Sequence, residues 1–68
     1  MEKGKIKFFN ISKGYGFIFP DKGGQDVFVH ISELETSGYN NLNVGDRVQY
    51  KLKAHKKGKE QAWNIKLI

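Results

Sequence analysis

The sequence contains no cysteine, which excludes disulfide bonds and cysteine-based zinc sites as braces for the fold. No apolar run approaches the roughly 18 residues that a membrane-spanning helix needs, and the first residues do not lead into the apolar region of a secretion signal. With 68 residues, the chain has room for one domain, over residues 1–68, and none for a separate catalytic domain. We therefore expect one small cytoplasmic domain that does not act at a membrane.

Catalytic motifs are also missing. No nucleophile is accompanied by a base, no acidic pair stands in a catalytic context, and no glycine-rich loop matches a phosphate cradle. His30 has no metal-ligating partners at a suitable spacing. We predict that the protein is not an enzyme and has no cofactor, no metal site and no small-molecule substrate.

No stretch of ten or more residues has a helical hydrophobic period, and the pattern instead indicates short strands. The expected strands are residues 5–10, 15–19, 26–30, 47–53 and 60–67. One helical turn is expected at residues 32–35, where Ser32 is placed to cap it. The longest irregular stretch, residues 36–44, precedes the fourth strand. Five short strands with one long connection predict an all-β fold, a five-stranded antiparallel Greek-key barrel of the OB type.

Positive charge is concentrated at the two ends of the chain. Residues 1–13 carry four lysines and one glutamate (+3), residues 14–50 carry two cations and five acids (−3), and residues 51–68 carry six lysines and one glutamate (+5). A barrel that brings the ends together would form one positive surface, suited to nucleic acid first and to an anionic membrane second. A lysine-rich surface with no partner is the alternative that charge alone leaves open.

The second and third expected strands have apolar residues on both faces. Side chains alternate along a strand, so one face of this pair carries Ile18, Val27 and Val29, which we assign to the core. The rings on the outer face are those of Tyr15, Phe17, Phe28 and His30. Clustered exposed rings usually mark an interaction site, and rings with lysines nearby suit the stacking of unpaired bases.

Other interpretations compete with this assignment. If the rings formed the core, Gly16 would occupy an outward position without a reason. The flanking lysines disfavour a protein–protein patch, because lysine is depleted in such interfaces. An RNA-recognition motif would need two long amphipathic helices, and duplex binding would favour groove-reading arginines, of which Arg47 is the only one. A barrel with a protein partner is the remaining alternative outside nucleic-acid binding.

Two segments, residues 13–18 (KGYGFI) and 27–32 (VFVHIS), are similar to the two nucleic-acid-binding motifs of the cold-shock domain. Residues 4–10 resemble the opening segment of that family, and Leu42, Gly45 and residues 61–65 match its later landmarks. The resemblance covers essentially the whole chain. It implies a five-stranded OB barrel that binds single-stranded RNA or DNA, as bacterial cold-shock proteins do, and an RNA-chaperone role in the regulation of transcription or translation.

Position by position, the resemblance implies the following nucleic-acid-binding residues: Lys7, Phe8, Asn10, Lys13, Tyr15, Phe17, Asp26, Phe28, His30, Tyr39 and Lys57. The family usually has Trp at the position of Phe8 and an aromatic residue at that of Ile31, so one ring is smaller and one is absent. At the basic hairpin tip, Lys57 is the best match, and Lys56 and Lys59 are the alternatives.

The first strand poses a problem of parity. Ile6 should be buried and Phe8 should be exposed, yet the two lie on the same face of a regular strand. A bulge or a strong twist is needed to reconcile these expectations. Phe19 poses a similar choice, since it either extends the aromatic face or packs at the end of the barrel beside Pro20.

Two further residues and the assembly remain to be assigned. Asp26 either accepts a hydrogen bond from a base edge or steadies the turn at Gly23. Trp63 shares its parity with Ile65, which we place in the core, so we expect Trp63 to have a structural role. We expect a monomer, and the long glycine-containing loop leaves strand exchange into a dimer open.

Overall fold

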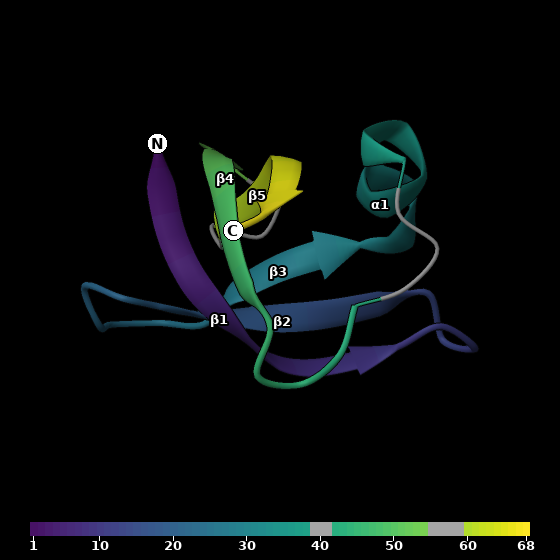
Figure 1. Cartoon of the computed structure of the whole chain (residues 1–68), viewed down its shortest axis with the longest axis horizontal. Helices are drawn as coiled ribbons and strands as arrows, with labels where there is room; N and C mark the ends of the chain where they lie inside the picture. The colour runs from purple at the N-terminus through teal and green to yellow at the C-terminus, as the bar shows by residue number, and fades with distance from the viewer. Residues whose placement is uncertain (39–41, 55–59) are drawn as a thin grey trace.

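The computed structural model describes residues 1–38, 42–54 and 60–68. Its elements are β1 (Glu2–Asn10), β2 (Tyr15–Pro20), β3 (Val27–His30), α1 (Ile31–Ser37), β4 (Arg47–Ala54) and β5 (Glu60–Leu67). The strands form a closed barrel in the order β1-β2-β3-β5-β4, and α1 packs against β5 and β3 (Figure 1). The predicted all-β barrel of the OB type is confirmed. Within the described ranges, no helix has the length and apolar character needed to cross a membrane.

The number of strands dictates one exception to antiparallel pairing. Strand directions can alternate around a closed ring only when the number of strands is even, so a five-stranded barrel needs at least one parallel junction. Here β3 runs parallel to β5, with Phe28 opposite Gln61, while the other four junctions are antiparallel. The expected antiparallel barrel therefore holds at every junction except this one.

Hydrophobic side chains fill the interior of the barrel. The buried ones are Ile6, Ile18, Val27, Val29, Leu34, Leu42, Val48, Tyr50, Ala62 and Ile65. The three core residues predicted for β2 and β3 are among them, so the aromatic residues at the alternate positions face outward. The interpretation that placed the rings in the core is thus wrong.

At Gly16, β1 and β2 approach each other closely on the inner side. A methyl group added to Gly16 would lie 2.3 Å from the Phe9 ring and 2.5 Å from the Phe8 carbonyl oxygen. Only glycine leaves room for this approach, because a backbone oxygen cannot rotate away as a side chain can. Phe9 uses the space to pack against the core.

The first strand contains the bulge that the parity of its residues required. Ile6 pairs with Ile18 and Phe8 pairs with Phe17, so Lys7 is an additional residue in β1. The added residue reverses the facing of the strand. Ile6 is consequently 1% exposed, whereas Phe8 is 40% exposed.

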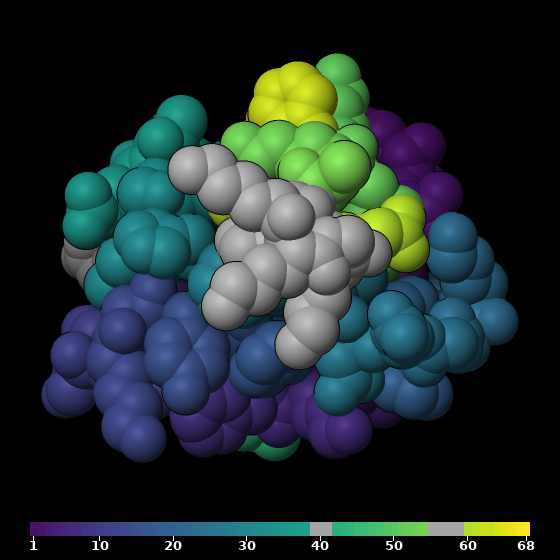
Figure 2. Space-filling model, turned by 180° about the vertical axis from the view of Figure 1, so that it is seen from behind, coloured from purple at the N-terminus to yellow at the C-terminus, as the bar shows by residue number. Residues whose placement is uncertain are grey.

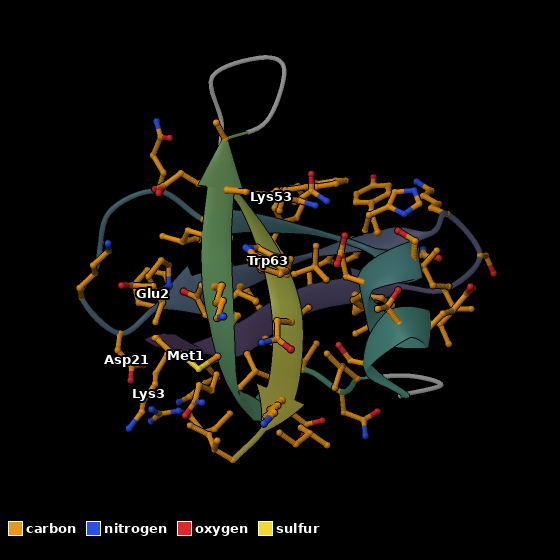
Figure 3. All side chains as sticks on the ribbon, turned by 90° about the horizontal axis from the view of Figure 1, so that it is seen from above. Met1, Glu2, Lys3, Asp21, Lys53 and Trp63 are labelled. Carbon is orange, nitrogen blue, oxygen red and sulfur yellow. The ribbon has the colours of Figure 1, made fainter. Side chains whose placement is uncertain are left out.

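The expected alternation in β5 is wrong. Trp63 shares its parity with Ile65, yet Trp63 is exposed and Ile65 is buried. The cause is Asn64, whose φ of 54° lies in the left-handed region. Between Gln49 and Lys51 on β4, the partner positions on β5 move from 66 to 63, so β5 also contains an additional residue. Trp63 therefore lies outside the core, beside β4 and β5 (Figure 3).

Helix α1 is longer than the single turn expected, and Ser32 is not its N-cap. His30 caps the helix, because its Nδ1 accepts a hydrogen bond of 3.1 Å from the Ser32 amide. The ring nitrogen thus replaces the side-chain oxygen that usually fills this position. The helix ends at Gly38, whose φ of 87° suits glycine.

Tyr50 is the largest fully buried side chain, and its hydroxyl has no hydrogen-bond partner within the described part of the chain. Burial, assisted by the negative charges of Glu2, Asp21 and Glu60, raises the pKa of Tyr50 from 10.0 to about 12. The folded protein therefore keeps this proton to a higher pH than the unfolded chain does. The resulting stability is complete below pH 10 and is lost as the pH rises towards 12.

We predict that Tyr50→Phe removes this loss. Between pH 10 and 12, the free energy of unfolding should decrease more steeply with pH in the natural protein than in the variant. The difference between the two slopes should be up to about 1.4 kcal/mol per pH unit. At neutral pH the variant should be as stable or more stable by about 1 kcal/mol, since it lacks an unpaired buried hydroxyl. Denaturant unfolding at each pH measures both effects. Parallel pH profiles would contradict the assignment to Tyr50.

Candidate nucleic-acid interface

Five rings from three strands form a continuous surface, called here the aromatic platform. Its members are Phe8 of β1, Tyr15 and Phe17 of β2, and Phe28 and His30 of β3. The centroids of neighbouring rings are 5.9–6.5 Å apart. Tyr15 and Phe28 lie nearly parallel, at 20°, whereas Phe17 meets both of them edge-on. Such contacts hold the rings against one another. Phe8 and His30 are exposed, and the other three rings are half-buried.

Strand register brings these rings together. Phe17 pairs with Phe8 on one side and with Phe28 on the other, and Tyr15 pairs with His30. Directly paired residues share a face of the sheet, so three strands contribute to one surface. Figure 2 shows the side chains of β1, in purple, next to those of β2, in blue, on the face turned away from the viewer in Figure 1.

Lys7, the additional residue of the β1 bulge, forms an ion pair with Asp26. Its Nζ lies 3.1 Å from Asp26 Oδ2, and the two side chains are 59% and 32% exposed. Asp26 thus contacts Lys7, and no hydrogen bond among the described residues joins Asp26 to the turn at Gly23. An exposed pair of this kind contributes about 0–1 kcal/mol. A phosphate can therefore compete with the carboxylate for Lys7.

Asn10 and Lys13 belong to the turn between β1 and β2. The Asn10 side-chain oxygen accepts a hydrogen bond of 3.0 Å from the Lys13 amide, and its carbonyl oxygen accepts one of 2.9 Å from the Gly14 amide. Both acceptors are therefore engaged in holding the turn. Lys13 is exposed and has no ion pair with any described residue. Asn10 thereby fixes the backbone of the turn that carries Lys13.

His30 serves two structures at once. Its ring lies 6.4 Å from that of Phe28 in the platform, and its Nδ1 contacts the Ser32 amide and hydroxyl at 3.1 and 2.9 Å. Because Nδ1 accepts from the amide, the neutral ring carries its proton on Nε2. The cap fixes the orientation of the ring and leaves Nε2–H as the outward donor.

Three positions that the family resemblance singled out remain. Tyr39 and Lys57, like the alternatives Lys56 and Lys59, lie outside the described residues. Ile31 begins α1 and donates its amide to the Gly14 carbonyl oxygen at 2.9 Å, so this position adds no ring to the platform.

Two residues next to the platform complete its surroundings. Phe19 is 49% exposed, which disfavours its packing at the end of the barrel. Lys5 lies directly opposite Phe19 across the β1–β2 pair. The sequence analysis did not assign Lys5 to the site. Its position two residues before Lys7, on the same strand, was a signal that could have identified it.

The first strand and the end of the chain both lie beside Arg47. β1 pairs with β4, where Lys5 lies opposite Arg47, and the amide of Ile68 donates to the Arg47 carbonyl oxygen at 3.0 Å. Part of this charge is neutralised locally. The ion pairs are Lys7–Asp26, Lys22–Glu2, Arg47–Asp21 and Lys53–Glu33. Among the described residues, Lys5 and Lys13 near the platform have no such partner.

The fold and the platform together define a class, the small OB-type barrels that expose aromatic rings beside lysines. The family model of the 'Cold-shock' DNA-binding domain matches residues 2–68. This chain therefore belongs to the cold-shock domain family of nucleic-acid-binding proteins.

Similar proteins carry the same family name. The chain is 48% identical over 66 residues to a probable cold shock protein of Sinorhizobium fredii, with 96% of each chain covered. It is 47% identical over 60 residues to the cold shock-like protein CspE of Escherichia coli, covering 88% of this chain and 87% of that one. For cold shock protein 1 of Arabidopsis thaliana, the identity is 47% over 62 residues. That match covers 91% of this chain but only 21% of the plant protein.

We predict that His30→Ala lowers the free energy of unfolding by about 0.5–2 kcal/mol, the usual cost of losing an N-cap. His30→Asn should keep most of that stability, because its side-chain oxygen can accept the same amide hydrogen. Denaturant unfolding of both variants measures the difference. An equal loss in the two variants would show that the cap does not stabilise α1.

Proposed function

We propose that this barrel binds single-stranded RNA or DNA across β1, β2 and β3, by stacking bases on the aromatic platform. The single observation that carries the proposal is the continuous row of partly exposed rings on three adjacent strands, where an ordinary barrel would be polar. Burying such rings against water-soluble bases removes apolar area from water. Every base has a flat face, so stacking tolerates many sequences.

Lysines at the border of the platform hold the phosphates. Lys7 exchanges Asp26 for a phosphate, and Lys13 contributes a second contact from the turn between β1 and β2. Lys57, which lies outside the described residues, supplies further charge. These contacts orient the strand without reading its sequence. Asp26, released from Lys7, becomes available to accept a hydrogen bond from a base edge. Tyr39 adds a ring from the long connection.

A protein that holds bases unpaired shifts the equilibrium of a weak hairpin towards its open form, because it binds only that form. This mass-action effect needs no ATP. We therefore propose an RNA-chaperone role in the regulation of transcription or translation. The family resemblance supports this role, together with a cytoplasmic location and a monomeric state, and no small molecule takes part.

We predict that Phe17→Ala and Phe28→Ala each weaken the binding of a short oligothymidine by about 5- to 150-fold, which corresponds to 1–3 kcal/mol of stacking per base. The natural protein should bind the matching duplex much more weakly, since paired bases cannot lie on the rings. Fluorescence anisotropy of a labelled oligonucleotide measures these affinities.

The chain offers a matched control for these variants. Phe8 and Trp63 are 40% and 38% exposed, but only Phe8 belongs to the platform. Phe8→Ala should weaken binding, and Trp63→Ala should leave it within about twofold, well under the factor of ten that 1.4 kcal/mol represents. Unchanged affinity in the platform variants would sink the stacking model. Equal affinity for duplex and single strand would do the same.

We also predict a moderate dependence on salt. If about three to five phosphates are neutralised, the slope of log K against log salt concentration should be about −2 to −3.5. Lys13→Ala should make the slope less negative by about 0.7, the value for one contact with a single strand. Lys66→Ala, an exposed lysine on β5, is the control for a general loss of charge. A slope near zero would exclude the phosphate contacts.

A further inference from the structure

An apolar hollow of about 370 Å³ lies beside β1, outside the aromatic platform. It is lined by Lys5, Ile6, Lys7, Phe19, Val44 and Gly45. Phe19 is 49% exposed and Val44 is 70% exposed, so the described chain covers neither side chain. Single exposed apolar side chains are common on protein surfaces, but two that line the same hollow indicate an interaction site.

The walls of the hollow are fixed by backbone hydrogen bonds. At the β1 bulge, the Ile6 amide donates to the Asp46 carbonyl oxygen and the Gly45 amide donates to the Ile6 carbonyl oxygen, both at 2.9 Å. The segment before β4 is thereby held against β1, which places Val44 across from Phe19. The hollow is a preformed feature of the fold, so a ligand would not have to order it.

The hollow continues the aromatic platform along β2. Tyr15, Phe17 and Phe19 occupy alternate positions of the strand and face the same side. Tyr15 and Phe17 have ring centroids 5.9 Å apart. The same two-residue step, about 7 Å of strand, leads from Phe17 to Phe19. On the neighbouring strand, Lys5 lies opposite Phe19 as Phe8 lies opposite Phe17.

Charge identifies the occupant. Lys5 and Lys7 border the hollow, and Lys5 has no ion pair with a described residue. An apolar floor between two cations suits a flat base with a phosphate on either side. It suits a protein surface poorly, because lysine is depleted in protein–protein interfaces.

We propose that this hollow binds one further base of the same single strand, at the end of the platform next to Phe8 and Phe17. The base lies against Phe19 and Val44, and its flanking phosphates contact Lys5 and Lys7. This inference rests on the proposed function and extends it, since it assigns a base-binding position and a phosphate contact to residues outside the platform.

The test measures affinity against strand length. Oligothymidines from about four to eight nucleotides, within the range that one OB barrel binds, are titrated by calorimetry into the natural protein, Phe19→Ser and Val44→Ser. For the natural protein, the last nucleotide that strengthens binding should do so by about fivefold or more. Both variants should lose this last step and keep the affinity for the shortest strands. Val44→Ser lies outside the strands, so it remains informative if Phe19→Ser is unstable.

Two controls separate the base from the phosphate. Replacing the terminal nucleotide by an abasic one, at the 5′ and at the 3′ end in turn, should abolish the last step at one end in the natural protein and change nothing in Phe19→Ser. Lys5→Ala should make the salt slope less negative by about 0.7 for the longest strand and leave the slope for the shortest strand unchanged. Lys66→Ala is the matched lysine control.

Several outcomes would overturn the proposal. If the last nucleotide strengthened binding equally in the natural protein and in both variants, no base would bind in the hollow. The proposal for the platform would be unaffected. An equal loss at every length would make Phe19 a support of the platform instead of a separate position. A concentration-dependent dimer that Phe19→Ser abolishes would assign the hollow to a second copy of the chain. Failure of the natural protein to bind any strand would remove the proposed function and this inference together.

Discussion

The β-bulge at Lys7 is the constraint on which the outer surface of this barrel depends. One additional residue turns Ile6 into the core and Phe8 out of it. Lys7, the additional residue, contacts Asp26, and the neighbouring Ile6 uses its amide and carbonyl groups to hold the segment before β4. Without the bulge, Phe8 would follow Ile6 into the interior, because residues two apart on a regular strand share a face, and the platform would lose this ring. A single change of register thus links the core, the rings and the adjacent hollow.

The barrel has apolar residues on both faces of β2 and β3, and the two faces differ in the size and shape of their side chains. Branched aliphatic side chains fill the narrow interior, where close packing matters most. The rings lie outside and shield one another through contacts of about 6 Å. This arrangement leaves apolar surface exposed to water, and a sequence selected only for stability would bury that surface. Tyr50, whose hydroxyl is buried without a partner among the described residues, is a second place where the small core is not optimal.

Capping and binding meet at His30. The ring belongs to the platform, and the same ring satisfies the first free amide of α1. A loss of binding on substitution of His30 would therefore mix a missing ring with a loosened helix, which the asparagine variant separates. Asn10 presents a similar case, since its oxygens hold the turn from which Lys13 extends. In both, a residue that the family resemblance assigned to nucleic-acid binding also has a structural task.

Much of this architecture follows from local patterns in the chain. Alternation along a strand has a period of two that the backbone imposes, so Ile18, Val27 and Val29 were placed in the core and the rings on the opposite face without knowledge of the partners. The need for a bulge in β1 was also evident, because Ile6 and Phe8 could not otherwise satisfy both environments. The exposure of Trp63, the histidine cap and the hollow beside Phe19 were decided by the tertiary structure. The left-handed Asn64 depends on the register between β4 and β5, the cap on the direction in which β3 delivers the ring, and the hollow on a segment some 25 positions away in the chain. Such features depend on pairings between distant segments. The local hydrophobic period of a sequence carries no information about those pairings.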